Sequence, residues 1–186
     1  MNESVRSMVL GPSVLYGVAV IAFVFTIVRR PTEDSAEAID GIVRLYLIGI
    51  AFQCLHFTEE FVTGFYVRAP EFLGFVPWPS EFFVIFNLSW IALWVVAAVG
   101  IKRRIRAAYF PVWFFAIGMV GNAIWHPLLC VATRGYFPGL FTSPFAGVTR
   151  RDSAFAALEI NERNDRHRLS GRHVASVFFS AYESRR

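Results

Sequence analysis

The residues best suited to chemistry lie in two apolar stretches of the chain. His56, Glu59 and Glu60 are three and four positions apart, so a helix would place them one turn apart on one face. Asn122 and His126 have the same four-residue spacing further along the sequence. Two imidazoles with one or two carboxylates form a common ligand set for zinc or non-haem iron. These residues are therefore the first candidates for a functional site.

Burying such groups in a membrane is costly, which indicates that they contact one another. One charge at the bilayer centre costs about 3 kcal/mol on insertion scales, so charged groups normally face the interior of a helix bundle. We expect His56, Glu60 and His126 to bind a metal, with Glu59 as a further ligand or as the general base. The residues expected to orient these ligands or to line the pocket are Asn122, Asn87, Gln53, Thr63 and Tyr136.

Long apolar runs supply the helices that would position these side chains. Hydrophobic residues make up 55% of the 186-residue chain, against about 45–50% in soluble domains. Because a bilayer core needs about 20 apolar residues as helix, we predict an all-α integral membrane bundle of four to five transmembrane helices. The predicted helices cover about 8–28, 41–67, 82–101 and 109–133, with a short fifth helix at 137–148 left open.

Two other segments differ from these runs. The segment 68–80 contains Pro70, Pro77 and Pro79, which predicts that it forms no regular helix. Residues 149–186 carry eight arginines and only short apolar patches. We therefore predict a transmembrane domain at 1–148, followed by a polar, weakly ordered tail.

The basic residues predict the orientation of the bundle. With the N-terminus outside, the inner loops carry six basic residues, and the outer segments carry Arg6, Arg68 and Arg134. The six inner residues are Arg29, Arg30, Lys102, Arg103, Arg104 and Arg106. Cytoplasmic loops are enriched in Lys and Arg, so we predict an N-out protein. With a helical rise of about 1.5 Å per residue, His56, Glu60, His126 and Asn87 then all fall in the outer half of the bilayer.

Several of these residues also carry a family resemblance. His56-Phe57-Thr58-Glu59-Glu60, a second histidine at 126 and Tyr136-Phe137-Pro138-Gly139 together resemble the HXXEE family of small bacterial membrane proteins of unestablished function. The resemblance covers about Leu15 to Leu140. It implies a bacterial inner-membrane protein but no particular reaction.

Three functions fit the cluster. The first is a membrane-embedded enzyme that uses one divalent metal (zinc, iron or manganese) to activate water or oxygen against a lipid or another hydrophobic substrate. The second is a metal-free isomerase or cyclase of a terpenoid-like lipid. There, one of the two adjacent buried carboxylates would be the acid, and Trp90, Trp94 and Trp125 would stabilise a carbocation.

The third function is a non-enzymatic carrier of protons, ions or small molecules. A purely structural alternative is that the polar residues tie two helices together by hydrogen bonds. The expected partners are membrane lipid and a hydrophobic small molecule. Nucleic acid is not an expected partner, because the basic residues cluster at the ends of apolar runs, and the sequence indicates no protein partner.

Overall fold

The computed structural model describes residues 2–28 and 36–144, and all regular structure in these ranges is helical. The helices are α1 (Glu3–Leu10), α2 (Ser13–Val28), α3 (Ala36–Val62), α4 (Phe65–Phe72), α5 (Ser80–Lys102), the short 3₁₀ helix η1 (Arg106–Ala108) and α6 (Tyr109–Thr133). Four stretches are long and apolar enough to span a membrane: Glu3–Val28, Ala36–Val62, Ser80–Lys102 and Arg106–Thr133. The predicted fold class is confirmed. The predicted tail lies outside the described residues.

The chain after α3 differs from the sequence prediction. α3 ends at Val62 rather than near residue 67, because Gly64 adopts a φ of +77° that favours glycine and stops a helix. The predicted irregular segment 68–80 begins instead within α4, which contains Pro70. The proline cannot donate to the carbonyl of Tyr66 one turn earlier, and the backbone N–H of Trp78 binds that carbonyl at 2.9 Å. The returning chain thus stabilises the helix that proline would disfavour.

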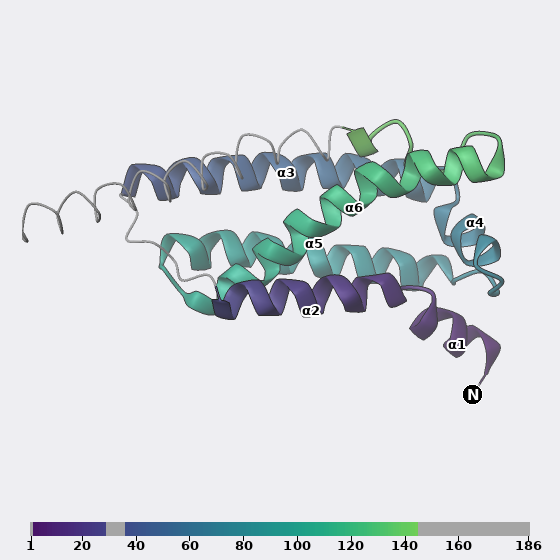
Figure 1. The fold of residues 1–186 in the computed structure, drawn as a ribbon, viewed down its shortest axis with the longest axis horizontal. Coiled ribbons are helices and arrows are strands. Elements are labelled where there is room, and N and C mark those ends of the chain that lie inside the picture. The colour runs from purple at the N-terminus through teal and green to yellow at the C-terminus, as the bar shows by residue number, and fades with distance from the viewer. Residues whose placement is uncertain (1, 29–35, 145–186) are drawn as a thin grey trace, which may run out of the picture. The chain divides into compact units, whose positions relative to one another are not determined.

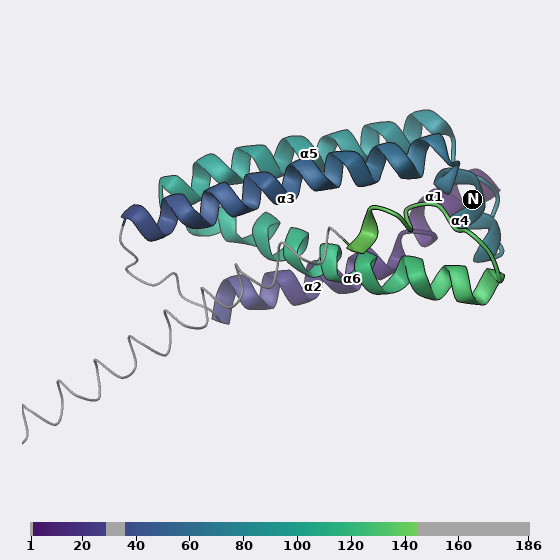
Figure 2. The same cartoon turned by 90° about the horizontal axis from the view of Figure 1, so that it is seen from above.

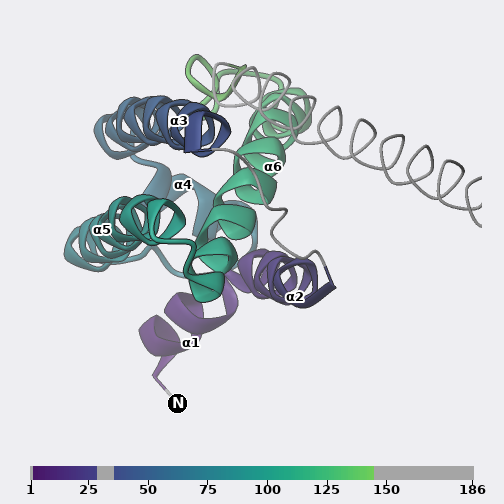
Figure 3. The same ribbon diagram turned by 90° about the vertical axis from the view of Figure 1, so that its left-hand side faces the viewer.

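The long helices form two pairs. α3 packs mainly against α5, and α2 packs mainly against α6. Figure 1 shows α6 crossing the bundle, and Figure 2 shows the two pairs side by side. α6 runs obliquely, so that it lies between α2 and α5 at one end and approaches the end of α3 at the other (Figure 3). This oblique path brings α6 side chains to the C-terminal part of α3.

The end of the bundle that carries η1 is held by charged and small residues. The Lys102 ammonium group lies 3.0 Å from the Asp40 carboxylate, and Arg106 donates to the carbonyl of Ile27 at 2.8 Å. Gly100 packs directly against Ala108. These contacts tie α2, α3 and α5 together close to the turn into α6.

Aromatic rings fill the core between the helix pairs. Trp90 stacks on Phe114 with ring centroids 4.1 Å apart, and Phe115 contacts both Tyr46 and Trp94 at 5.3 and 4.9 Å. Many other apolar side chains are exposed, Val14 by 72% and Val131 by 77%. Apolar side chains exposed along most of a helix suit lipid contact.

The sequence leaves open whether 137–148 forms a short fifth helix. Residues 138–142 form turns, residues 143 and 144 are helical, and residues 145–148 lie outside the described residues, so the fifth helix stays a prediction. The turns fold back over the ends of α3 and α6, where the candidate site lies.

Candidate metal centre

Helix α3 places His56 and Glu60 one turn apart on its buried face. The His56 side chain has no exposed surface, and that of Glu60 is 8% exposed. Nε2 of His56 lies 3.5 Å from Oε1 of Glu60. The i, i+4 spacing produces this contact directly, because such residues lie above one another on a helix.

Helix α6 places His126 next to the same carboxylate oxygen of Glu60. Its Nε2 lies 3.4 Å from Oε1 of Glu60, and its ring is 4.7 Å from that of His56, nearly perpendicular to it at 86°. One ligand atom from each of the three residues lies within 4.8 Å of the others. The structure therefore brings together the three residues that the sequence predicted as metal ligands.

Residues 136–142, which follow α6 and are called the covering segment, pack over this cluster and fix the tautomer of His126. Nδ1 of His126 lies 2.6 Å from the carbonyl oxygen of Pro138. A carbonyl accepts but cannot donate, so Nδ1 carries the proton and Nε2 of a neutral ring presents a lone pair to Glu60. The sequence predicts that Asn122 orients His126; in the structure it is the Pro138 carbonyl that accepts from Nδ1 of this ring.

Gly139 fits tightly between the two imidazoles. Its φ is +89°, and an added Cβ would lie 2.5 Å from Nδ1 of His126 and 2.9 Å from Cε1 of His56. Only a residue without a side chain allows this approach. The Tyr-x-Pro-Gly motif thus contacts the cluster through both its proline carbonyl and its glycine.

Glu59 points to the covering segment rather than to the cluster. Its Oε1 accepts from the Tyr136 hydroxyl at 2.8 Å and from the Phe141 N–H at 3.0 Å. Its Oε2 accepts from the N–H and the hydroxyl of Thr142 at 2.8 and 2.6 Å. Partial burial, reinforced by the Glu59 carboxylate, raises the pKa of Tyr136, so this hydroxyl keeps its proton and donates. Glu59 is not among the three residues that converge as ligands.

The remaining predicted residues lie outside the ligand cluster. Asn87 donates to the carbonyl of Phe83, and Thr63 donates to that of Glu59, each within its own helix. Gln53 is buried on α3, and its Oε1 has no hydrogen-bond partner among the described residues. Asn122 is half-buried on α6.

Besides the Pro138 carbonyl, two further groups that the sequence does not reveal contact the cluster. The Thr142 hydroxyl lies 2.8 Å from Nδ1 of His56, and the ring of Phe65 lies 5.6 Å from that of His126. Phe65 in turn contacts Phe83, Phe137 and Trp78. An aromatic wall therefore borders the cluster, built from residues that the apolar pattern alone does not distinguish.

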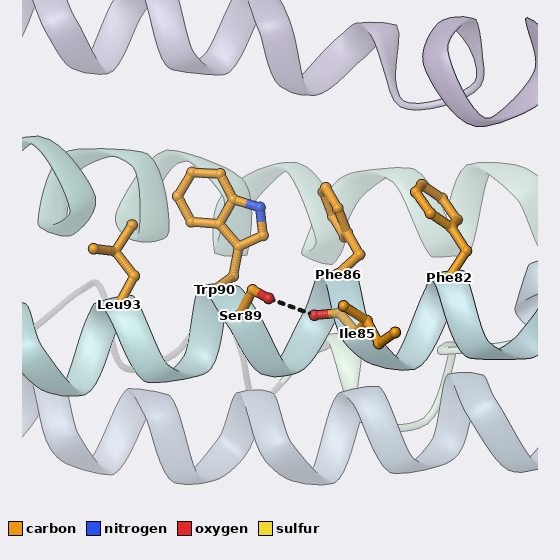
Figure 4. A pocket seen from close by; sticks show the side chains of 6 residues that line it. All are labelled: Phe82, Ile85, Phe86, Ser89, Trp90 and Leu93. Carbon is orange, nitrogen blue, oxygen red and sulfur yellow. Dashed lines mark hydrogen bonds between the residues drawn. The ribbon is translucent and has the colours of Figure 1, made fainter. Parts of the chain in front are cut away.

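The three tryptophans proposed for a carbocation cage are not gathered around the cluster. Trp94 is buried in the core, whereas Trp125 is 44% exposed. Trp90 lines a groove of about 390 Å³ on α5, shown in Figure 4 with Phe82, Ile85, Phe86, Ser89 and Leu93. This groove includes none of the candidate ligands.

Two of the three distances between the ligand atoms, those from Glu60 to each histidine, are longer than hydrogen bonds and close to the spacing of ligands on a metal ion. Ligands about 2.0–2.1 Å from a tetrahedral zinc ion are about 3.3–3.4 Å from one another, close to the observed 3.4 and 3.5 Å. Hydrogen bonds to oxygen are normally about 2.7–3.2 Å. Nε2 of His56 is buried without a hydrogen-bond partner in the described part of the chain.

One known protein family matches the part of the chain that contains this cluster. Residues 47–148 match the family described as proteins of unknown function with the HXXEE motif. No curated protein and no solved structure matches the chain. The matched region contains all three candidate ligands, Glu59 and the covering segment. Because it spans more than half of the 186 residues, the chain belongs to the HXXEE family.

Proposed function

We propose that this protein is a membrane-embedded enzyme that uses one divalent metal, held by His56, Glu60 and His126, to act on a hydrophobic substrate. The observation that carries the proposal is the convergence of three ligand atoms within 4.8 Å of one another. Structural zinc sites usually have four protein ligands, whereas catalytic sites have three and leave a position for water or substrate. A set of two histidines and one carboxylate is typical of catalytic zinc and non-haem iron.

The surroundings of the cluster favour an uncharged, apolar substrate. Phe65, Phe83 and Phe137 form a ring-to-ring wall beside His126. The nearest contacts recorded for the cluster come from neutral groups, the Thr142 hydroxyl and the Pro138 carbonyl. A metal bound here would polarise a carbonyl or activate a bound water or oxygen next to this wall.

We also propose that the protein lies in a bacterial inner membrane with its N-terminus outside. The support is the excess of basic residues in the loops after the first and third spanning helices. In that orientation the C-terminal end of α3 faces outward. The metal cluster then lies near the outer surface, beneath the turns at 138–142.

A lipid-turnover assay tests the enzymatic proposal. Protein reconstituted in vesicles of total bacterial lipid, with zinc, iron or manganese added, is compared with Glu60→Gln by untargeted mass spectrometry. We expect at least one neutral lipid to be converted by the wild type and not by the variant. Conversion by the wild type that persists in the presence of chelators would support metal-free chemistry instead. A pH-dependent flux without any conversion would support a carrier.

A further inference from the structure

Hydrogen bonds connect Nδ1 of His56 to Glu59 through the side chain of Thr142, which lies in the covering segment. Nδ1 of His56 lies 2.8 Å from Oγ1 of Thr142, and that hydroxyl lies 2.6 Å from Oε2 of Glu59. Thr142 is 86 positions from His56 in the sequence. A continuous hydrogen-bonded chain therefore leads from the metal cluster to the second glutamate of the motif.

The direction of each bond in this chain follows from the donors around Glu59. Two backbone N–H groups, those of Phe141 and Thr142, donate to the carboxylate. The Tyr136 hydroxyl adds a third bond. A carboxylate with this many donors is stabilised as the ionised, acceptor-only form. The single hydroxyl proton of Thr142 is then directed to Glu59, and its oxygen is left to accept from His56.

We propose that Glu59 and Thr142 are positioning residues that hold His56 as the Nδ1–H tautomer, with the Nε2 lone pair directed at the metal. The proposal rests on the proposed function, because it assigns a role at the same site. Metal-binding histidines almost always donate their other N–H to a carboxylate, a carbonyl or water. His126 uses the Pro138 carbonyl in this way, and His56 uses Thr142 backed by Glu59.

Charge balance supports this role for Glu59. A divalent cation with Glu60 as its single anionic ligand keeps a net charge of about +1, which is costly in a low-dielectric interior. Glu59 supplies a second negative charge next to the ligands without occupying a coordination position. The motif would then use its two adjacent glutamates for different tasks, one to bind the metal and the other to balance its charge and orient a ligand.

Thr142→Val isolates the hydroxyl in this chain. Valine has the shape of threonine, and the backbone N–H groups of residues 141 and 142 can still bind Glu59. Thr142→Ser keeps the hydroxyl. Thr58→Val is the matched control, because its hydroxyl binds the Cys54 carbonyl within α3 and has no recorded contact with the cluster.

Two measurements on these variants test the proposal. The chain has four histidines, so ¹⁵N-histidine labelling with His→Gln variants for assignment lets solid-state NMR report the His56 tautomer in metal-free protein. Competition with a chelating dye gives the dissociation constant for zinc. We expect Nδ1–H for His56 in the wild type, in Thr142→Ser and in Thr58→Val. Thr142→Val should lose this tautomer preference and bind zinc about 10- to 100-fold more weakly.

The outcomes separate this inference from the proposed function. If Thr142→Val keeps both the Nδ1–H tautomer and wild-type zinc affinity, the positioning role is overturned while the metal site stands. If the wild type binds no metal but Thr142→Val still changes the tautomer, the positioning role stands and the metal proposal fails. A wild-type His56 found as the Nε2–H tautomer would overturn the inference directly.

Discussion

Glu60 directs a single carboxylate oxygen at both imidazoles. When each ring donates from Nδ1 and Glu60 is ionised, as a metal ligand must be, the two Nε2 atoms and Oε1 are all hydrogen-bond acceptors. Acceptors that converge without donors repel one another, and the repulsion is strong in a buried site. A cation at their centre converts this repulsion into attraction, so stability and metal binding should be coupled at this residue.

Glu60→Gln should uncouple them. Glutamine keeps the shape of the side chain, removes the charge and supplies donors to the histidines, so the metal-free variant should unfold at or above the wild-type temperature. Excess zinc at about 100 times its dissociation constant should stabilise the wild type by about 2.7 kcal/mol and the variant much less. Thermal unfolding in detergent, with zinc or with EDTA, measures both effects. Equal responses of the two proteins to zinc would contradict the assignment of Glu60.

Gly139→Ala should push the covering segment away from the two imidazoles and destabilise the protein. The new methyl group would collide with both rings, and alanine disfavours a φ of +89°, so we expect a loss of about 1–3 kcal/mol. Gly135→Ala is the control, because an added Cβ there meets nothing within 4 Å. Detergent-based unfolding compares the two, and similar stabilities would show that the turns are not packed on the cluster.

The sequence could predict the three ligands but not how they are oriented. Helical spacing pairs His56 with Glu60, and equal depth in the bilayer brings His126 to them. Thr142 and the Pro138 carbonyl lie on turns whose path depends on Gly139 and on backbone hydrogen bonds, and these leave no periodic signal. For the same reason the role of Glu59 could not be separated from that of Glu60.

Among the elements, hydropathy located the long helices better than their ends. α6 has the predicted bounds of 109–133, whereas α3 begins and ends about five residues earlier than predicted. Hydropathy shows which residues are apolar enough to contact lipid, but it does not show where the backbone stops being helical. The end of α3 is set by the positive φ of Gly64, and α4 is stabilised by the hydrogen bond from Trp78 to the Tyr66 carbonyl that Pro70 leaves free.

Gly100 offers a test of how α5 meets η1 and the start of α6. An added Cβ would lie 2.5 Å from Cβ of Ala108, and overpacking of this kind costs about 1–3 kcal/mol. Helix propensity alone would favour alanine by about 0.5–1 kcal/mol. We therefore expect Gly100→Ala to destabilise the protein and Gly17→Ala, which meets nothing within 4 Å, to stabilise it. A stabilised Gly100→Ala variant would contradict this packing.

At the scale of the whole molecule, the proposed orientation can be tested by labelling. In a background without Cys54 and Cys130, single cysteines replace Glu71, before α5, or Arg103, after it; both positions are exposed. An impermeant maleimide added to intact cells should label position 71 about tenfold faster than position 103. Permeabilised cells should label both. The reverse preference in intact cells would place the N-terminus inside.

The metal content of the purified protein shows whether His56, Glu60 and His126 bind an ion. Wild-type protein purified without chelators should contain about one zinc, iron or manganese ion per chain by mass spectrometry, because three protein ligands are sufficient for a catalytic site. His56→Ala and His126→Ala should each reduce this to background, while the matched control His167→Ala in the predicted tail retains it. Wild-type protein that holds no metal after incubation with each ion, or a His126→Ala variant that keeps its full content, would contradict the proposed metal site.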